Sequence, residues 1–98
     1  MSEPRIRIDK WLWHARFYRT RALAQDAAES GHVRLNGARV VKSGQGIKIG
    51  DVLTVPTGRE VLAVRVTGFG LRRGPAPEAR TLYEIVADGP LDQGSPSP

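Results

Sequence analysis

Cationic and aromatic side chains alternate in residues 9–25, DKWLWHARFYRTRALAQ. Trp11 and Trp13 are separated by one residue, and Phe17 and Tyr18 follow them. Most of the cations among them are arginines, whose planar guanidinium can donate two parallel hydrogen bonds to phosphate and can stack on a flat ring. This combination of residue types is typical of surfaces that contact phosphate groups or unpaired bases.

The positive charge is concentrated in the first half of the 98-residue chain, whose formal net charge is +5. Residues 1–49 contain ten Lys and Arg against four Asp and Glu, whereas residues 50–98 contain five against six. Twelve of the fifteen cations are arginines. A basic half of this kind indicates an anionic polymer or an anionic membrane as partner. An ordinary soluble basic protein is the plainer interpretation.

Residues for catalysis or metal binding are sparse. The chain has no cysteine, and His14 and His32 have no carboxylate at ligand spacing. The stretches SGQGIKIG and GFGLRRG do not match the dinucleotide or nucleoside-triphosphate patterns. Asp9, Asp26 and Asp51 have plainer roles as a helix cap, a solvated helix residue and a turn residue. We therefore expect a non-enzymatic protein with no metal, no cofactor and no small-molecule substrate.

The same features bear on the compartment. A chain without cysteine suits the reducing cytoplasm. The N-terminal stretch lacks the apolar core of a signal peptide, and no apolar run approaches the ~20 residues of a membrane span. We expect a cytoplasmic protein with no membrane partner.

Two helices are expected to position the basic residues. The first is predicted to start at Asp9 as its cap and to run to about Phe17, after a frayed arm at residues 1–7. One of its faces is apolar, and it comprises Ile8, Trp11, Leu12 and Ala15. The opposite face comprises Lys10, Trp13, His14 and Phe17.

A second helix is predicted over residues 21–30, with Thr20 as its cap and Gly31 at its end. Its flank carries Arg21 and Gln25. Its apolar face comprises Leu23, Ala24, Ala27 and Ala28.

Short strands follow the helices. HVRLNGARVV predicts a hairpin with an Asn36-Gly37 turn, which would place Val33 and Val40 inward and pair Arg34 with Arg39 outward. Like charges opposite each other are destabilising, unless an anion covers them. Further strands are expected at 52–55, 59–67 and 82–87, with loops at 42–46 and 68–81 and a disordered tail at 88–98. The fold class is therefore α+β, with two helices before a small, mostly antiparallel sheet of about five strands.

Residues 5–55 resemble the RNA-binding domain named after ribosomal small-subunit protein four, here called the S-four-type domain. The resemblance implies the αL motif, in which two helices precede a small curled sheet. The residues that carry it jointly are Arg7-x-Asp9-Lys10, Arg16, Thr20-Arg21, Gly31-x-Val33, Asn36-Gly37, Lys42 and Gly50-Asp51.

Two stretches, DKWLWHARFYRTR and RRGPAPEARTLYE, also resemble the free-standing small ribosome-associated heat-shock proteins. The likeness then covers residues 5 to about 87. It implies one domain at residues 1–87, with extra strands in 59–87. It implies that the partners are structured RNA (rRNA, possibly tRNA) and the large ribosomal subunit, in rescue or recycling of stalled subunits that carry a nascent chain. We expect the basic C-terminal extension of that family to be short or missing here, because DGPLDQGSPSP is not basic.

Other functions remain open at this point. The chain could be the RNA-binding subunit of an rRNA-modifying enzyme, which would need a catalytic partner chain. It could instead be a basic module for proteins or membrane surfaces. We expect a monomer.

The candidate RNA-binding residues are the cations of the helices and hairpin with two neutral neighbours: Arg7, Lys10, Arg16, Arg19, Thr20, Arg21, Gln25, Arg34, Arg39, Lys42 and Lys48. Several of these residues have a plainer structural role as an alternative. Thr20 is expected to cap the second helix before it contacts RNA, and Arg16 could form an ion pair with Asp9. Trp13 and Phe17 could stack on bases, but we expect residues 59–87 to cover them because an exposed aromatic pair is costly.

Overall fold

The computed structural model describes residues 3–58 and 60–90, which form an α+β fold. In chain order the elements are β1 (Ile6–Arg7), α1 (Ile8–His14), α2 (Arg21–Glu29), β2 (Arg34–Leu35), β3 (Ala38–Arg39), β4 (Gly46–Ile47), β5 (Val52–Thr57), β6 (Glu60–Val66), α3 (Ala76–Ala79), a 3₁₀ turn (Arg80–Leu82) and β7 (Tyr83–Pro90). The strands form an antiparallel pair, β1-β4, and an antiparallel five-stranded sheet in the order β3-β2-β5-β6-β7. The predicted mixture of helices and antiparallel strands is confirmed.

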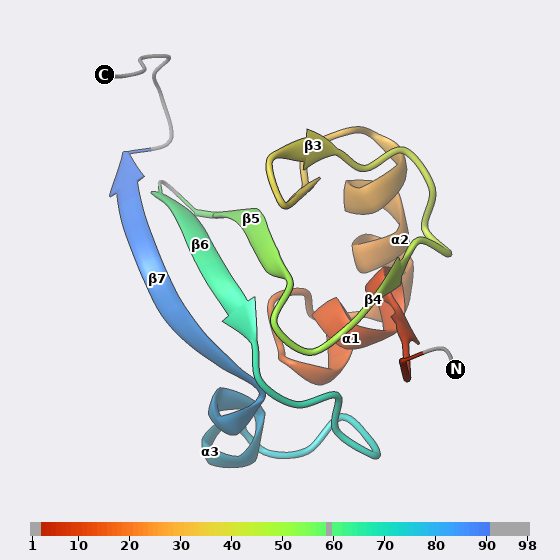
Figure 1. Ribbon diagram of the computed structural model, residues 1–98, viewed down its shortest axis with the longest axis vertical. Coiled ribbons are helices and arrows are strands. Elements are labelled where there is room, and N and C mark those ends of the chain that lie inside the picture. Colours follow the sequence, from red (N-terminus) through yellow and green to blue (C-terminus); the bar gives the residue numbers. More distant parts are fainter. Residues whose placement is uncertain (1–2, 59, 91–98) are drawn as a thin grey trace.

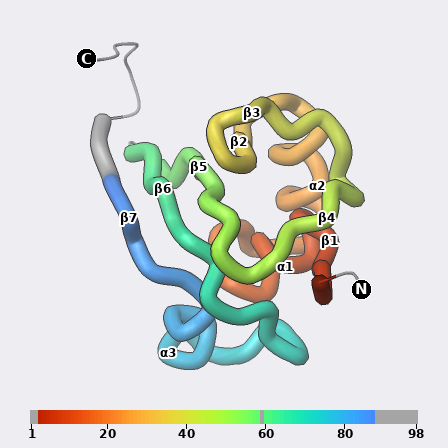
Figure 2. Tube along the Cα trace, in the orientation of Figure 1, coloured from red at the N-terminus to blue at the C-terminus, as the bar shows by residue number. Residues whose placement is uncertain are grey.

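The helices and the long strands occupy different sides of the molecule. In Figure 1, α1 and α2 lie to one side of β5, β6 and β7, and α3 lies below them at the lower end of β7. The chain trace shows the β2–β3 hairpin beside α2 and the strand β4 beside β1 (Figure 2). The first helix packs against α2, and the hairpin joins the long strands through the pairing of β2 with β5.

The apolar face of α1 forms the centre of the core, as predicted. Ile8, Trp11 and Leu12 are fully buried, and the indole Nε1 of Trp11 donates to the Gly68 carbonyl at 2.7 Å. The other buried apolar residues of this cluster are Ala15, Ala24, Ala27, Ala28, Val33, Val40, Ile47, Leu53, Val55, Val64, Val66 and Leu82. Small alanines on α2 allow the two helices to approach closely.

The start and end of α1 differ from the prediction. The cap position is Arg7, with no side-chain cap bond, and Asp9 lies within the first turn. The helix ends at His14 instead of Phe17, because the backbone N–H groups of Arg16 and Phe17 donate to the carbonyls of Trp13 and Leu12. Arg16 has a φ of 66°. This is a Schellman ending, with Arg16 at the left-handed position that glycine usually occupies.

The C-terminal segment covers the rings of Trp13 and Phe17, as expected. Trp13 and Phe17 are both half-buried and pack against the core. The ring centroids of Phe17 and Tyr83 are 4.9 Å apart, and the Arg73 guanidinium lies 5.8 Å from the centroid of Trp13. Because protein side chains already cover much of both rings, base stacking is not needed to explain them.

The second helix follows the prediction in its caps and departs from it at one apolar position. The Thr20 hydroxyl accepts a hydrogen bond from the Leu23 backbone N–H at 3.1 Å, and Gly31 takes a φ of 82° after the helix. Leu23 is 47% exposed and so does not belong to the buried face. The cap therefore depends on local chemistry, whereas the burial of Leu23 would require a neighbour that residues 3–58 and 60–90 do not supply.

The hairpin has the predicted turn and register. Arg34 pairs with Arg39, and Leu35 with Ala38, around the Asn36-Gly37 turn. The backbone N–H of Val40 donates to the carbonyl of Val33 at 2.9 Å, and both of these side chains are buried. Arg34 and Arg39 lie exposed on the outer face.

Asn36 joins this hairpin to β5. Its carboxamide accepts from the Val52 backbone N–H at 2.9 Å and donates to the Asp51 carboxylate at 3.2 Å. Asp51 is only 6% exposed, so the prediction of a simple turn residue was incomplete. Burial raises the pKa of Asp51, but hydrogen bonds from the Lys48 backbone N–H, Asn36 and the Lys48 ammonium outweigh it, and the net pKa is lowered.

Three segments predicted as irregular contain regular structure. The arm at residues 1–7 includes β1, because Ile6 and Arg7 pair with Ile47 and Gly46. The expected loop at 68–81 contains α3 and the start of the 3₁₀ turn. Strand β7 continues through Pro90, so the expected tail does not begin at residue 88, and the rest of that tail lies outside the described residues. Among the described residues, no helix is long and apolar enough to span a bilayer.

We predict that Asn36→Ala lowers the free energy of unfolding by about 1–3 kcal/mol, because it removes two hydrogen bonds and places a Cβ-bearing side chain without polar atoms at a φ of 50°. Asn36→Gly loses the same hydrogen bonds but tolerates the backbone conformation, so it should cost less. Urea denaturation of both variants measures the difference. Equal losses in both variants would contradict a contribution from the backbone at this turn.

Candidate nucleic-acid interface

The buried carboxylate of Asp9 is contacted by three of the candidate residues, Arg7, Arg21 and Gln25. Its side chain is fully buried, and it accepts hydrogen bonds from Arg7 Nε at 3.1 Å and Arg7 Nη2 at 3.0 Å. The backbone N–H of Lys10 donates to the same carboxylate at 2.7 Å, and Arg21 Nη2 lies 3.6 Å from Oδ1. One carboxylate thus joins β1, α1 and the first residue of α2.

These contacts set the protonation of Asp9. Burial raises the pKa of the carboxyl group, because the charged form is poorly solvated. Hydrogen bonds from Arg7, the Lys10 N–H and Gln25, together with the charge of Arg21, lower it by more. The net pKa is below its usual value, so the group is ionised at neutral pH and holds both guanidinium groups.

The two arginines keep part of their surface free for a ligand. The side chain of Arg7 is 51% exposed and that of Arg21 is 39% exposed. A guanidinium carries five N–H donors, of which Asp9 occupies two on Arg7. Arg21 Nε is buried, with no hydrogen-bond partner among the described residues. The remaining exposed donors can bind a phosphate oxygen without breaking the contacts that orient them.

The predicted site residues are brought together only in part. Arg7, Arg21 and Gln25 converge on Asp9, whereas Arg34 and Arg39 lie on the hairpin. Thr20 uses its hydroxyl as the cap of α2, which was its plainer role. The other exposed members of the predicted set are Lys10, Arg16, Arg19 and Lys42.

Lys48 is less available than the sequence suggested. Its ammonium lies 3.1 Å from the carboxylate of Asp51, which is itself nearly buried. This ion pair compensates the charge of Lys48 within the protein. We therefore expect Lys48 to contribute less to an anionic partner than Arg34 or Arg39.

Arg39 depends on a nearby glycine. A Cβ added at Gly31 would lie only 2.8 Å from Arg39 Nε, and Gly31 also has a left-handed φ of 82°. The arginine side chain therefore passes close to the backbone at the end of α2, and the left-handed φ of Gly31 is the stronger reason for glycine there.

Arg16 does not form the ion pair with Asp9 that its spacing suggested. Its Nη1 donates to the Gly74 carbonyl at 2.8 Å, and the arginines on Asp9 are Arg7 and Arg21. The helical spacing from Asp9 to Arg16 is interrupted because α1 ends at His14. Arg73 and Arg80 also lie near Arg16. The sequence analysis did not identify them as its neighbours, although both lie in the stretch RRGPAPEARTLYE.

Together, the fold and the oriented arginines define a small basic α+β module of the class that binds phosphate-bearing polymers. Residues 6–53, which run from β1 to the start of β5, match the S4 domain family. The chain belongs to the S4-domain family that includes heat shock protein 15 and the RQC P-site tRNA stabilizing factors.

Individual relatives support this assignment. A heat shock protein 15 homolog of Aeromonas salmonicida is 45% identical over 85% of this chain, which spans 62% of that relative's length. The RQC P-site tRNA stabilizing factor of Bacillus subtilis is 36% identical over 90% of this chain and 100% of its own length. The solved structure of Vibrio cholerae heat shock protein 15 has a TM-score of 0.80 and 39% identity, covering 86% of this chain and 84% of the other. That structure is described as trimeric, so the expectation of a monomer is not confirmed.

We predict that Asp9→Asn lowers stability at neutral pH by about 1–3 kcal/mol, because a carboxamide accepts weaker hydrogen bonds from Arg7 and has no charge to attract Arg21. The folded-state pKa of Asp9 lies below its unfolded value of about 3.9, so its stabilisation is present above that pH and is lost as the pH falls through the folded-state pKa. As the pH falls through this acidic range, the free energy of unfolding should therefore decrease less in Asp9→Asn than in the parent.

Urea denaturation from pH 7 to pH 2 measures this difference. Asp26→Asn is the matched control, because Asp26 is an exposed carboxylate on α2. If Asp9→Asn and Asp26→Asn gave the same acid profile, Asp9 would not be the stabilising carboxylate.

Proposed function

We propose that this protein binds structured RNA through its oriented arginines and associates with the large ribosomal subunit. Its role would be the rescue or recycling of stalled subunits that hold a nascent chain on tRNA, and its RNA ligand would be rRNA, tRNA or both. The observation that carries the proposal is the Asp9 carboxylate, which holds Arg7 and Arg21 in fixed positions with part of each guanidinium exposed.

The physical argument concerns preorganisation. A flexible surface arginine loses side-chain entropy when it binds, of up to about 2 kcal/mol. Arg7 and Arg21 are already restrained by the buried carboxylate, so less entropy remains to be lost on contact with a phosphate. Folded RNA presents phosphates at fixed spacing, and a rigid pair of guanidinium groups is suited to such a target.

The relatives support the ribosomal part of the proposal. The names of the relatives from Bacillus subtilis and Halalkalibacterium halodurans describe factors that stabilise a P-site tRNA, and this chain matches 100% and 98% of their lengths. The αL arrangement of two helices and a curled sheet would then supply the RNA-binding frame. In this proposal the protein is a non-enzymatic factor that acts in the cytoplasm, where its ribosomal partner is.

We predict that Arg7→Ala and Arg21→Ala each weaken binding to folded RNA by about tenfold, or ~1.4 kcal/mol, because each removes a charged donor to phosphate. The loss should be similar across RNA sequences, and the slope of log K against log salt should fall by about one unit per variant. Fluorescence anisotropy with labelled tRNA, measured at several salt concentrations, tests both statements.

The same variants test the ribosomal partner in a sucrose gradient of cell lysate. The parent protein should sediment with free large subunits, and Arg21→Ala should remain near the top. Arg65→Ala is the charge-matched control, since Arg65 is exposed on β6 and paired with Glu84 at 2.6 Å. If the parent protein stayed at the top at every salt concentration, the proposed association with the large subunit would be wrong.

A further inference from the structure

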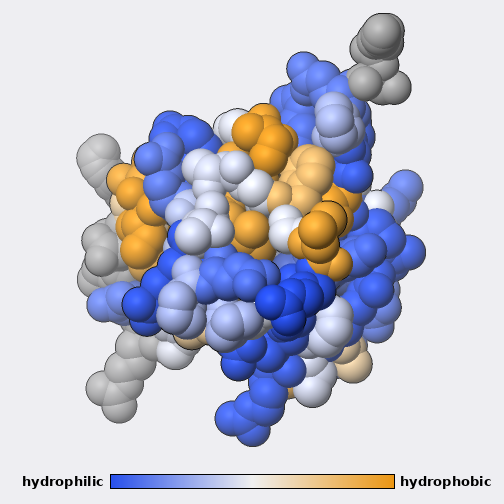
Figure 3. Space-filling model, turned by 90° about the horizontal axis from the view of Figure 1, so that it is seen from below, coloured by the Kyte–Doolittle hydropathy of each residue, from blue (hydrophilic) through white to orange (hydrophobic). Residues whose placement is uncertain are grey.

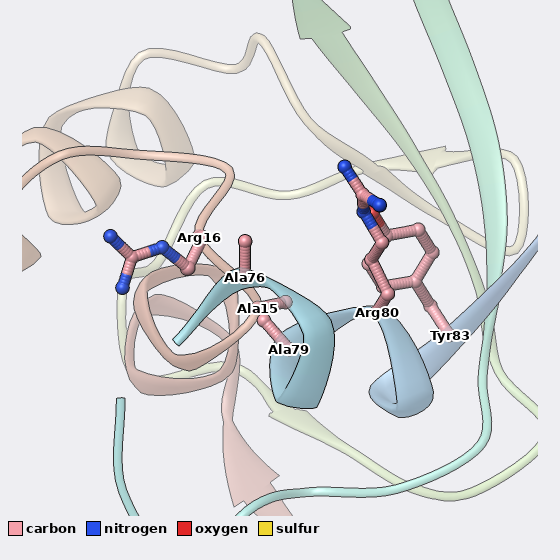
Figure 4. A pocket seen from close by; sticks show the side chains of 6 residues that line it. All are labelled: Ala15, Arg16, Ala76, Ala79, Arg80 and Tyr83. Atoms are coloured by element: carbon pink, nitrogen blue, oxygen red, sulfur yellow. The ribbon is translucent and has the colours of Figure 1, made fainter. Parts of the chain in front are cut away.

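The open pocket beside α3 does not bring polar groups together. It has a volume of about 270 Å³, and its lining residues are Ala15, Arg16, Ala76, Ala79, Arg80 and Tyr83. Figure 4 shows the guanidinium groups of Arg16 and Arg80 pointing away from each other across the alanines. Seen from below in Figure 3, hydrophilic residues cover much of the surface, with apolar residues exposed between them. Neither feature defines a ligand, whereas the hairpin turn carries a side chain with a defined reaction.

That side chain belongs to Asn36. It is the only asparagine in the chain, and Gly37 follows it. Asparagine is a thermally labile residue, because the backbone nitrogen of the next residue can attack its side-chain carbonyl carbon. Glycine hinders this attack least, since it has no Cβ and its backbone is the most free to move. The single asparagine therefore stands in the sequence most prone to lose its side-chain amide.

The reaction needs only water as a co-reactant. A bond forms between the Gly37 backbone nitrogen and Asn36 Cγ, and the bond between Cγ and Nδ2 breaks. The Gly37 amide proton leaves with the departing nitrogen as ammonia, and a five-membered succinimide ring remains. Water then opens either ring C–N bond, which gives aspartate or isoaspartate, whose backbone continues through the side-chain carbon. Asn36 and Gly37 are both exposed, so water reaches them.

Three hydrogen bonds hold Asn36 away from this reaction. Its backbone N–H donates to the Val52 carbonyl at 2.7 Å, and its Oδ1 accepts from the Val52 N–H at 2.9 Å. Its Nδ2 donates to Asp51 Oδ1 at 3.2 Å. Both polar atoms of the carboxamide thus contact residues 51–52. The carboxamide has to leave both partners before Cγ reaches bonding distance of the Gly37 nitrogen, so the reaction requires the hairpin to open from β5.

The backbone of the turn is fixed as well. Asn36 and Gly37 have φ angles of 50° and 89°, and Leu35 pairs with Ala38 across them. Leu35 is also paired with Leu53 of β5. A five-membered ring imposes its own torsion angles on Asn36, and a two-residue turn closed by a strand pair does not allow that change while the hairpin is intact.

Either product would disrupt the contact between the hairpin and β5. Asp51 is only 6% exposed and accepts a hydrogen bond from Asn36. An aspartate at position 36 has no donor for it and places a second carboxylate beside the first, where two like charges repel. Lys48 already pairs with Asp51 at 3.1 Å and balances only one of the two charges. Isoaspartate adds a backbone carbon to a turn whose length sets the strand register.

We propose that Asn36 is a spontaneous modification site, which its contacts with Asp51 and Val52 keep unreacted in the folded protein. When the hairpin opens from β5, the amide is lost, and the resulting aspartate or isoaspartate prevents the original contact from forming again. Conversion of this one side chain therefore limits the lifetime of the native fold. The inference goes beyond the proposed RNA-binding function and does not depend on it.

The first test follows the side-chain amide by mass spectrometry. The full chain is incubated in mildly alkaline buffer with and without denaturing guanidinium chloride, and trypsin then releases residues 35–39, because it cleaves after Arg34 and Arg39. Conversion should be about tenfold slower or more in the native protein, since only the opened fraction reacts. Asn36→Gln is the matched control and should show no conversion over the same period, because its longer side chain would have to close a six-membered ring.

Equal rates in the native and unfolded chains would overturn the protection by Asp51 and Val52. The absence of conversion in the unfolded chain would overturn the modification site itself. Both rates are measured on the parent sequence, so neither result depends on the folding of a variant.

The second test uses Asn36→Asp, which reproduces one of the two products. It should melt about 5 °C or more below the parent, because its carboxylate faces that of Asp51. In Asn36→Asp/Asp51→Asn, one donor and one acceptor again face each other, so the double variant should melt above Asn36→Asp. If Asn36→Asp melted with the parent, or if adding Asp51→Asn did not raise its Tm, conversion would not damage this contact and the proposal would be wrong.

Discussion

The structure depends on a carboxylate that has been removed from water. Asp9 is fully buried, and an isolated charge in that position would be strongly destabilising. It is tolerated because Arg7, Arg21 and the Lys10 backbone N–H surround it. The requirement to satisfy one acidic group therefore ties the first strand to both helices. The same requirement orients the cations that we assign to RNA, so the stability of the fold and the geometry of the candidate site have a common origin.

Local features of this fold could be predicted from the sequence, whereas the contacts between distant segments could not, apart from the cover of Trp13 and Phe17 by the C-terminal segment. The Asn36-Gly37 turn and the Thr20 cap depend on residues within a few positions, and both were correct. Strand β1 exists only because Ile6 meets Ile47, which lies far along the chain. A two-residue strand has no periodicity of its own, and for that reason the arm was predicted as frayed.

The candidate site shows the same division. The basic stretch was evident from composition, yet the helical spacing offered Arg16 as a possible partner of Asp9, and the arginines that contact Asp9 are Arg7 and Arg21. That spacing assumes a continuous helix, and α1 ends at His14 because Arg16 adopts a left-handed backbone. Burial of Asp9 could not be inferred either, since an acidic residue near a helix start is usually a solvated cap. Arg7 is a local neighbour of Asp9, whereas Arg21 meets it only after α2 has packed against α1.

The C-terminal segment covers the aromatic side chains at the end of α1. Within the region that matches the S4 domain, Trp13 and Phe17 would present a large apolar surface. Tyr83 and Arg73 cover it, and the arginine adds a charge as well as a covering side chain. A hydrophobic residue could have covered Trp13 without repelling Arg16. The use of a cation at this contact places it close to Arg16, and burial together with the charge of Arg16 lowers the pKa of Arg73.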